Sequence, residues 1–275
     1  MLKGQFLGQI LDINSYNDEP TSMLNEHIKI VLISTLQQVR DACRFLSCVM
    51  TEQNPFYSTG KYKFDVEDSF NYFYSSSKYI LEDRISFLLI DLKNNQIIGA
   101  LLSFDFHHSI KKIQSFELEF GFQMEQYLVS NFNQTDNPRR KGMKMMKQQF
   151  YYQTYIQLKT FDSNLLKKHK LLEVSVGAIS SEYQKQQLIV KLQAFASIYA
   201  HQKYGYQYCV SIQINSHAQS LANRLWRSIL RIDYSCKNFT LSNEKIFEDV
   251  DIPNNKDVIY QGQVLSLPFT QQAKL

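Results

Sequence analysis

The chain has 275 residues, of which 44% are hydrophobic and 20% charged, a composition typical of a globular protein and not of a disordered or fibrous one. Its net charge of +4 is too mild to indicate nucleic-acid binding by itself, and we expect none. The four cysteines form no CxxC pair and lie in apolar segments, so we expect reduced thiols in an intracellular, cytoplasmic-type protein. We expect neither a signal peptide nor a membrane span, because no apolar stretch is long enough for either.

Residues 1–26 form an N-terminal extension in our interpretation, followed by a single domain over 27–275. Apolar residues at helical spacing between Phe6 and Ile13 predict a short amphipathic helix in this extension. Such a helix could dock on the domain itself or on a partner protein. The first strand of the domain is predicted at 27–34, which is rich in Ile and Val.

Two helices are predicted after this strand, at about 36–50 and 64–81, with Asp65 or Asp68 as the cap of the second. A β-hairpin is then predicted over 85–106, where an apolar run turns at Lys93–Asn95 and returns. The hairpin is the clearest local signal of the chain.

The segment from about 107 to 170 is interpreted as a helical insertion. One helix is predicted within 116–132, and a loop over 133–142, because Pro138 and Gly142 interrupt it. A longer helix is predicted from Met143 onward.

In our interpretation, the chain is organised around residues 171–215. Residues 171–179 predict a mostly buried strand, and Ser180–Glu182 interrupt it and can cap a helix. Apolar residues recur at helical spacing from Leu188 to Tyr199, and a second strand follows over 206–214. This order predicts two parallel strands with a right-handed crossover and a helix N-terminus that can hold phosphate. A helix over 217–230, a strand near 231–241 and a last strand over 260–269 complete the prediction.

This order of elements resembles the GNAT acetyltransferase fold over about 27–269. Within that superfamily it resembles the arylalkylamine or dopamine N-acetyltransferase-like branch, through the two insertion helices, the approach sequence FDSNLLKKHKLLEVSV at 161–176 and the long segment after the last helix. The resemblance implies an α/β (α+β) fold with a mixed, mostly antiparallel twisted sheet, a central parallel strand pair and flanking helices.

The resemblance also implies acetyl-CoA as cofactor, held between the strands at 174–179 and 208–214, and a small amine as acceptor. The pyrophosphate would lie on the turn at 183–189, and no metal would be needed. The residues facing the cofactor would be Ser175, Val176, Gly177, Ala178, Ile179, Gln184, Lys185, Gln186, Gln187, Leu188 and Ile189.

The turn departs from the family pattern Gln/Arg-x-x-Gly-x-Gly/Ala. Gln184 keeps the first position, but Gln187 and Ile189 replace the two small residues. Glycine lets the backbone approach a pyrophosphate closely, so these side chains are expected to weaken or abolish cofactor binding.

The catalytic base also departs from the pattern of the branch. An acid-Pro-Leu motif is replaced by Asn54-Pro55-Phe56, and an amide cannot accept a proton. Glu52 is the best remaining base, although a solvent-facing structural role is the alternative. Ser216 and Ser220, near the start of the last helix, correspond to hydroxyls close to the acceptor and the thiolate, or are ordinary helix-start residues.

Two further groups of side chains are candidate ligand sites. His107 and His108 have no partners at metal-ligand spacing, so no metal site is expected. The basic loop 139–147 could bind an acidic protein surface or the 3′-phosphate of CoA, or could be a solvated helix start. Two functions follow: an amine N-acetyltransferase with weakened or lost catalysis, or an inactive pseudo-acetyltransferase that serves as a structural subunit of a larger assembly. In the second case, a partner would contact the N-terminal extension and the basic loop.

Overall fold

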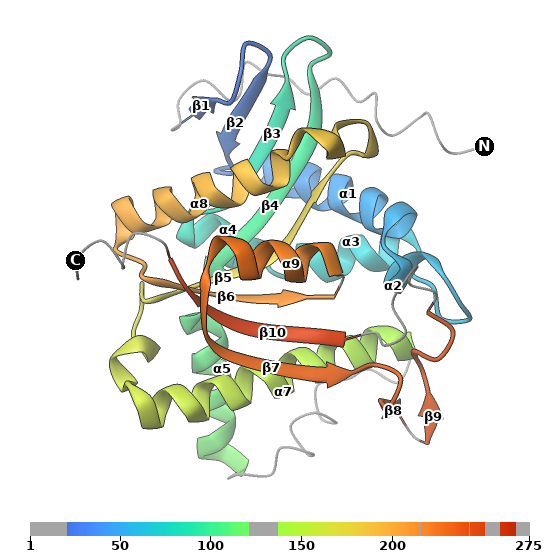
Figure 1. Cartoon of the computed structure of the whole chain (residues 1–275), viewed down its shortest axis with the longest axis vertical. Helices are drawn as coiled ribbons and strands as arrows, with labels where there is room; N and C mark the ends of the chain where they lie inside the picture. The colour runs from blue at the N-terminus through green and yellow to red at the C-terminus, as the bar shows by residue number, and fades with distance from the viewer. Residues whose placement is uncertain (1–20, 121–136, 215, 242, 251–258, 268–275) are drawn as a thin grey trace. The chain divides into compact units, whose positions relative to one another are not determined.

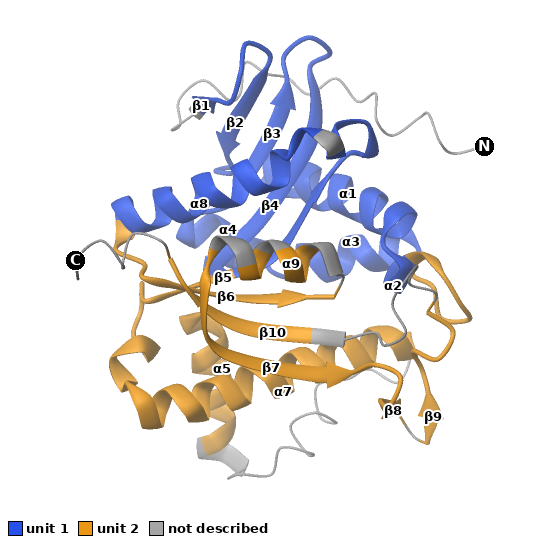
Figure 2. Ribbon diagram, in the orientation of Figure 1, with its two compact units in different colours: residues 1–57, 65–104, 174–203 blue, residues 58–64, 105–173, 204–275 orange. Residues whose placement is uncertain are grey.

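The computed structural model describes a mixed α/β fold with a mostly antiparallel β-sheet and flanking helices (Figure 1). The residues described are 21–120, 137–214, 216–241, 243–250 and 259–267. The chain divides into two compact units (Figure 2), the first formed by 1–57, 65–104 and 174–203 and the second by 58–64, 105–173 and 204–275. Strand β5, Leu171–Ile179, begins in the second unit and ends in the first. No helix among the described residues is both long and apolar enough to cross a membrane.

The sheet of the first unit contains five neighbouring strands in the order β1-β2-β3-β4-β5. Their bounds are β1 Thr21–Met23, β2 Ile28–Leu32, β3 Phe87–Asp91 and β4 Gln96–Asp105, with β5 as given above. The hairpin predicted over 85–106 is confirmed, because β3 and β4 pair antiparallel with Phe87 opposite Leu101. The register shifts after Leu89, beside Gly99.

The helices of the first unit are α1 Leu36–Gln53, α2 Pro55–Ser58, α3 Val66–Tyr74, α4 Ser77–Asp83, the 3-10 helix η3 Ser181–Gln186 and α8 Leu188–Tyr204. Two of them, α1 and α3, begin at a residue whose side chain caps them. Before α1, Thr35 Oγ1 accepts a bond from Gln38 N, and Gln38 Oε1 accepts one from Thr35 N, which forms a capping box.

The single helix predicted over 64–81 is wrong, because two helices, α3 and α4, occupy this segment. The hydroxyl of Ser75 donates to Tyr72 O at 2.6 Å, a local bond that competes with helix continuation. Asp65, and not Asp68, is the cap of α3, since Asp65 Oδ1 accepts from Asp68 N at 2.6 Å.

Aromatic side chains attach α8 to the strands of the first unit. The ring of Phe87 meets those of Phe195 and Tyr199 edge to face, with centroids 5.3 Å apart in both pairs. Figure 1 shows α8 and α1 on opposite sides of these strands. This packing fixes the axis of α8, and therefore where its N-terminus meets the end of β5.

In the second unit, the strand order is β5-β6-β10-β7. The further strands are β6 Tyr208–Gln213, β7 Arg227–Ser235 and β10 Ile259–Ser266, with a short pair formed by β8 Thr240–Leu241 and β9 Glu244–Lys245. The start of β5 and β6 form the parallel pair, where Lys170 O accepts from Gln207 N and Tyr208 N. Strand β10 is antiparallel to both β6 and β7.

The helices of the second unit are α5 His107–Phe120, α7 Pro138–Phe161, the 3-10 helix η2 Ser163–Leu166 and α9 Ser216–Leu225. The predicted loop over 133–142 is wrong for residues 138–142, because α7 already begins at Pro138. Asn137 Oδ1 accepts from Arg139 N at 3.0 Å, and proline at the first helical position suits a helix start. The helix predicted over 217–230 ends at Leu225, because residues from Arg227 onward pair with β10.

The core of the second unit lies between α7, α5 and one face of its strands. Gly262 in β10 faces Phe150 of α7 so closely that an added Cβ would lie 2.4 Å from the ring. The buried cluster comprises Phe106, Ile110, Ile113, Phe150, Tyr151, Tyr155, Leu158, Leu165, Leu166, Leu171, Val210 and Val264. The predicted helix at residues 6–13 and the predicted helical residues 121–132 lie outside the described part of the chain.

Candidate functional site

The turn from β5 to α8 follows a defined backbone course in the first unit. Ser180 N donates to Ile98 O at 2.9 Å and so extends the pairing of β5 with β4, and Tyr183 N donates to Ser180 O at 2.9 Å as η3 begins. Gln187 then takes φ 55° and ψ 25°, in the left-handed region, and α8 starts at the next residue. The turn is therefore a strand end, one 3-10 segment, one left-handed residue and a helix N-terminus.

Gln187 occupies the first of the two positions where the resembled pattern has a small residue. Its backbone has a conformation that glycine adopts freely and that costs other residues about 1–2 kcal/mol. Its side chain is exposed, as is that of Gln186. The chain thus keeps a glycine-like backbone at this position without glycine.

Ile189 occupies the second small-residue position and covers part of β5. A Cβ added to Gly177 would lie 3.1 Å from Ile189 Cδ1 and 2.7 Å from Leu101 Cδ1. The neighbouring β5 residues Ser175, Val176 and Ala178 are half-buried, and Ile179 is buried. An alanine or glycine in place of Ile189 would leave Gly177 more exposed.

Two side-chain bonds attach the turn to other elements of the first unit. The hydroxyl of Tyr183 donates to Asp91 Oδ2 at 2.6 Å, and Gln184 Nε2 donates to Gln53 Oε1 at 2.5 Å. Asp91 is 5% exposed at the end of β3. The bond to Asp91, followed by burial, raises the pKa of Tyr183 to about 12. The turn is therefore held at the C-terminal ends of both β3 and α1.

The start of α8 offers main-chain donors. The first bond of the helix runs from Lys191 N to Gln187 O at 3.2 Å. The three preceding N–H groups, those of residues 188–190, are the ones that a helix leaves for other acceptors. Together with the helix dipole they favour an anion, so the backbone of the turn fits a phosphate group. The side chain of Lys185 lies outside the described part of the structure.

Glu52, the predicted base, lies exposed in the last turn of α1. It is close enough to Cys48 that its charge, after burial, contributes to a raised pKa of that thiol. Asn54, where the branch has an acid, ends α1: its N donates to Met50 O at 3.0 Å and its Oδ1 accepts from Phe56 N at 3.0 Å. The amide therefore has a capping role between α1 and α2.

The two predicted serines are in α9 of the second unit. Ser216 begins the helix, although its side chain is not among those described, and Ser220 is exposed. The structure brings β5 and the turn together within the first unit, which also contains Glu52. The serines belong to the other unit, and their arrangement with Glu52 stays a prediction.

The comparisons with known proteins concern the fold. No family model matches the sequence, and no curated protein does either. A polyamine N-acetyltransferase of Drosophila melanogaster matches with a TM-score of 0.56 at 12% identity, over 86% of this chain and 100% of that one. A mosquito arylalkylamine N-acetyltransferase-like protein, 5b, matches with a TM-score of 0.55 at 15% identity, over 86% and 99%. A putative arylalkylamine N-acetyltransferase 7 of Aedes aegypti matches with 0.56 at 11%, over 87% of each chain.

The chain has a GNAT fold. As the order of elements in the sequence predicted, the proteins of similar fold include arylalkylamine N-acetyltransferases, and a polyamine N-acetyltransferase is also among them. In this GNAT fold, the strand β5 and the helix α8 flank the turn that the resembled pattern assigns to pyrophosphate.

The basic loop predicted at 139–147 is the start of helix α7, and internal partners bind two of its cations. The guanidinium of Arg139 is 0% exposed and donates to Asp249 Oδ1 at 2.5 Å, to Thr59 O and to Ile246 O. Lys147 Nζ lies 3.0 Å from Glu173 Oε1, a buried carboxylate in β5. Of the alternatives for this segment, a solvated helix start is wrong for Arg139, which is buried, and binding of an acidic protein surface or of the CoA 3′-phosphate stays a prediction.

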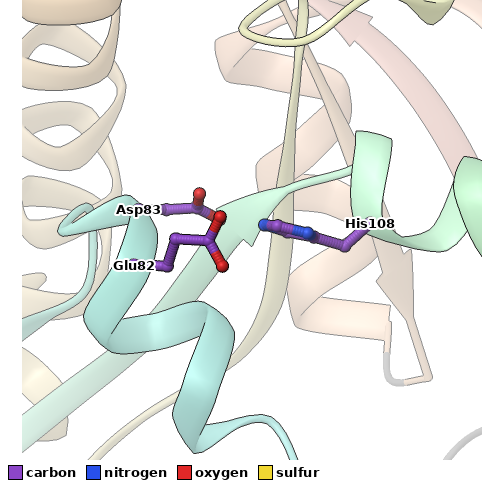
Figure 3. Close-up of side chains that lie close together, drawn as sticks. All are labelled: Glu82, Asp83 and His108. Atoms are coloured by element: carbon purple, nitrogen blue, oxygen red, sulfur yellow. The ribbon is translucent and has the colours of Figure 1, made fainter.

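No metal site is inferred from the histidine pair. His107 Nδ1 lies 2.9 Å from Leu166 O, a bond within the second unit. Figure 3 labels His108 at the start of α5 and Glu82 and Asp83 at the end of α4. Because α4 and α5 belong to different units, we assign no ligand set to these three side chains.

Sequence reasoning missed the residues that hold the turn. Asp91 ends the apolar run FLLID, and a carboxylate at the end of a buried strand was an available signal. Gln53 carried none, because one glutamine at a helix end among many glutamines is unremarkable in a sequence. Glu173 was visible as a polar interruption of a buried strand, but its partners Lys147, Tyr151 and Ser109 were not.

Proposed function

We propose that the protein is an acetyl-CoA-dependent N-acetyltransferase of a small amine in which cofactor binding, and with it catalysis, is weakened. The observation that carries the proposal is the left-handed backbone of Gln187 directly before α8. A non-glycine residue held in this conformation supports retention of a phosphate-binding turn after its glycine was replaced. The GNAT fold and the amine acetyltransferases among its structural relatives support the reaction class.

The roles of the residues follow from their positions in the first unit. The N–H groups of residues 188–190 would hold phosphate, and the backbone of Ser175–Ile179 would lie along the rest of the cofactor. Acetyl-CoA, when bound, supplies an acetyl group activated as a thioester. An amine must lose a proton to attack such a carbonyl, and the exposed carboxylate of Glu52 could accept that proton through water.

The weakening is attributed to two side chains. Gln187 adds a flexible side chain where close backbone approach is needed, and Ile189 covers Gly177. Glycine or alanine at these two positions would neither add a long side chain to the turn nor cover Gly177. Both changes act on binding of the cofactor and not on the fold of the turn.

Calorimetric titration of the full chain with acetyl-CoA tests the proposal. The double variant Gln187→Gly/Ile189→Ala is expected to bind at least about tenfold more tightly than the unaltered chain, a gain of about 1.4 kcal/mol. Gln202→Ala is the matched control, because this exposed glutamine lies near the end of α8, outside the turn, and it should leave affinity unchanged. Absence of binding by every variant would refute the cofactor site, and micromolar binding by the unaltered chain would refute the weakening.

A second candidate function is an inactive pseudo-acetyltransferase that serves as a structural subunit of a protein assembly. It is favoured by Asn54, whose amide caps α1 where the branch has an acid, and by exposed apolar side chains such as Phe161, 80% exposed. The two candidate functions predict different rates of acetyl transfer by the unaltered chain. Acetyl transfer to agmatine or tryptamine by the unaltered chain supports the enzyme. Transfer only after Asn54→Glu is added to the double variant supports the inactive form.

A further inference from the structure

The second unit has a sheet face built from buried glutamines. Gln213 in β6 and Gln261 and Gln263 in β10 are 4%, 1% and 0% exposed. Gly262 faces Phe150, so its neighbours Gln261 and Gln263 point to the opposite face, and Gln213 pairs directly with Gln261. Glutamine is mostly a surface residue, so three on one buried face need a chemical explanation.

Helix α9 lies against this face. Gln263 Nε2 donates to Asn223 Oδ1 of α9 at 3.0 Å, and Gln219 Nε2 of α9 donates to Gln213 O at 3.5 Å. Figure 1 shows α9 on the side of β6 and β10 away from α7. The glutamines are therefore enclosed between α9 and the sheet.

A carboxylate at the edge fixes the direction of the amides. Asp233 in β7 can only accept hydrogen bonds when ionised, and it accepts from Gln261 Nε2 at 3.1 Å. Arg231 donates to the same carboxylate through Nε and Nη2, at 3.0 and 2.7 Å, so the carboxylate oxygens act as acceptors here. The amide of Gln261 must therefore turn its oxygen inward.

The inward oxygen of Gln261 orients the next amide. Gln261 Oε1 accepts from Gln263 Nε2 at 2.7 Å, and the same nitrogen also donates to Asn223. With its nitrogen held by two acceptors, Gln263 directs Oε1 away from both. Asp233 thus determines that the buried end of this chain of amides is a carbonyl oxygen.

Two buried oxygens on this face receive no hydrogen bond from any residue that the structure describes. They are Gln263 Oε1 and Gln213 Oε1. Both are acceptors only, and a buried acceptor that lacks a donor is unfavourable. The face is consequently suited to a guest that donates hydrogen bonds and unsuited to an anion.

We propose that the β6–β10 face beneath α9 binds a small hydrogen-bond donor, either water or a primary ammonium group, through Gln213 Oε1 and Gln263 Oε1. The site is separate from the turn at 181–189 and does not depend on acetyl-CoA binding. Asp233 and Arg231 act indirectly, by setting the direction of the amides.

Two probes separate the sources of the donor. Methylammonium chloride should raise the thermal midpoint of the full chain if the site takes an ammonium group, whereas tetramethylammonium, which has no N–H, should not. If water is the guest, neither salt acts, and oxygen-17 relaxation dispersion should detect long-lived internal water. Either result supports the site only if Gln263→Met and Gln213→Met reduce the stabilisation by methylammonium or the signal of internal water. The control Gln207→Met, at an exposed glutamine of the same unit, should reduce neither.

Asp233→Asn tests conservatively whether Asp233 sets the direction of the amides of Gln261 and Gln263. An amide at this position can donate as well as accept, so Gln261 and Gln263 are free to reverse, and the guest signal should fall while the fold persists. The proposal is overturned if the guest signal is equal in the unaltered chain, Gln263→Met and Gln213→Met. It is also overturned if both methionine variants raise the unfolding midpoint, because the two oxygens are then simply unsatisfied.

Discussion

The N-terminus of α7 and the turn before α8 are both helix starts, but they differ in the burial of their polar side chains. At α7, Arg139 is fully buried against Asp249 and two main-chain carbonyls. At α8, Gln186 and Gln187 are exposed, and the residues that hold the turn are at its beginning. At the first helix start, the cation is bound by the protein's own groups. At the second, residues 188–190 carry the N–H groups for which a helix provides no acceptor.

The difference teaches that the strength of a charge does not indicate a binding site. Arg139 is a stronger anion ligand than any glutamine, yet its partner Asp249, 110 residues along the chain, excludes it from such a role. Glycine at position 60 makes this possible, because any Cβ there would collide with the Asp249 carboxylate. A weakly polar turn at a helix start, whose first N–H groups have no intrahelical acceptor, is the better candidate for phosphate.

The largest expected effect comes from breaking the internal pair. Arg139→Met should lower the free energy of unfolding by about 3 kcal/mol, at the low end for buried pairs because Asp249 is 39% exposed. Urea unfolding measures the change, and Lys111→Met, at an exposed residue of α5, is the control expected to shift little. Equal effects of the two substitutions would contradict the internal role of Arg139.

Glu173→Gln should lower the free energy of unfolding by about 2 kcal/mol, because it leaves the Lys147 ammonium half-buried without its countercharge. The hydroxyls of Tyr151 and Ser109 also donate to this carboxylate. A double-mutant cycle with Lys147→Met checks the cause. Additive effects of the two substitutions would show that the ion pair contributes nothing.

Tyr183→Phe tests the attachment of the turn and should cost about 1 kcal/mol, the usual net value of one hydrogen bond. The pKa of Tyr183 is raised to about 12, above the ordinary value of about 10. A raised pKa means that this contribution is complete below pH 10 and is lost as the pH rises from 10 to 12. Stability of the unaltered chain and the variant should therefore converge over that window. A constant difference between them up to pH 12 would argue against the bond to Asp91.

Gln187→Gly should have the smallest effect on stability and the opposite sign. Removing the side chain relieves the cost of about 1–2 kcal/mol for the left-handed conformation. The added freedom of glycine in the unfolded chain offsets most of this gain, so the net stabilisation should be below about 1 kcal/mol. Gln186→Gly, within η3, should destabilise instead. Hydrogen exchange of residues 181–189, with urea unfolding, distinguishes the two. Destabilisation by both substitutions would contradict the left-handed backbone of Gln187.

The sequence predicted the secondary-structure elements that depend on residues close to one another in the chain. The hairpin at β3–β4 and the strand–turn–helix–strand unit at β5–α8–β6 follow from apolar periodicity and turn residues. The break between α3 and α4 was missed because the hydroxyl bond of Ser75 competes with a helical pattern that runs through it. For the candidate site, the sequence indicated the turn and its two substituted positions. It could not indicate the hydrogen bonds of Tyr183 to Asp91 and of Gln184 to Gln53, because each joins side chains far apart in the chain. The same holds for the hydrogen bonds from Asp233 through the buried glutamines to Asn223.

The position of β10 has a consequence for how the protein is made. This strand lies between β6 and β7, both of which precede it in the chain. During synthesis, the facing edges of β6 and β7 lack their partner until residues 259–266 have left the ribosome. The buried glutamines at the middle of this sheet would then meet water, which makes the nascent edges less adhesive than apolar strands would be.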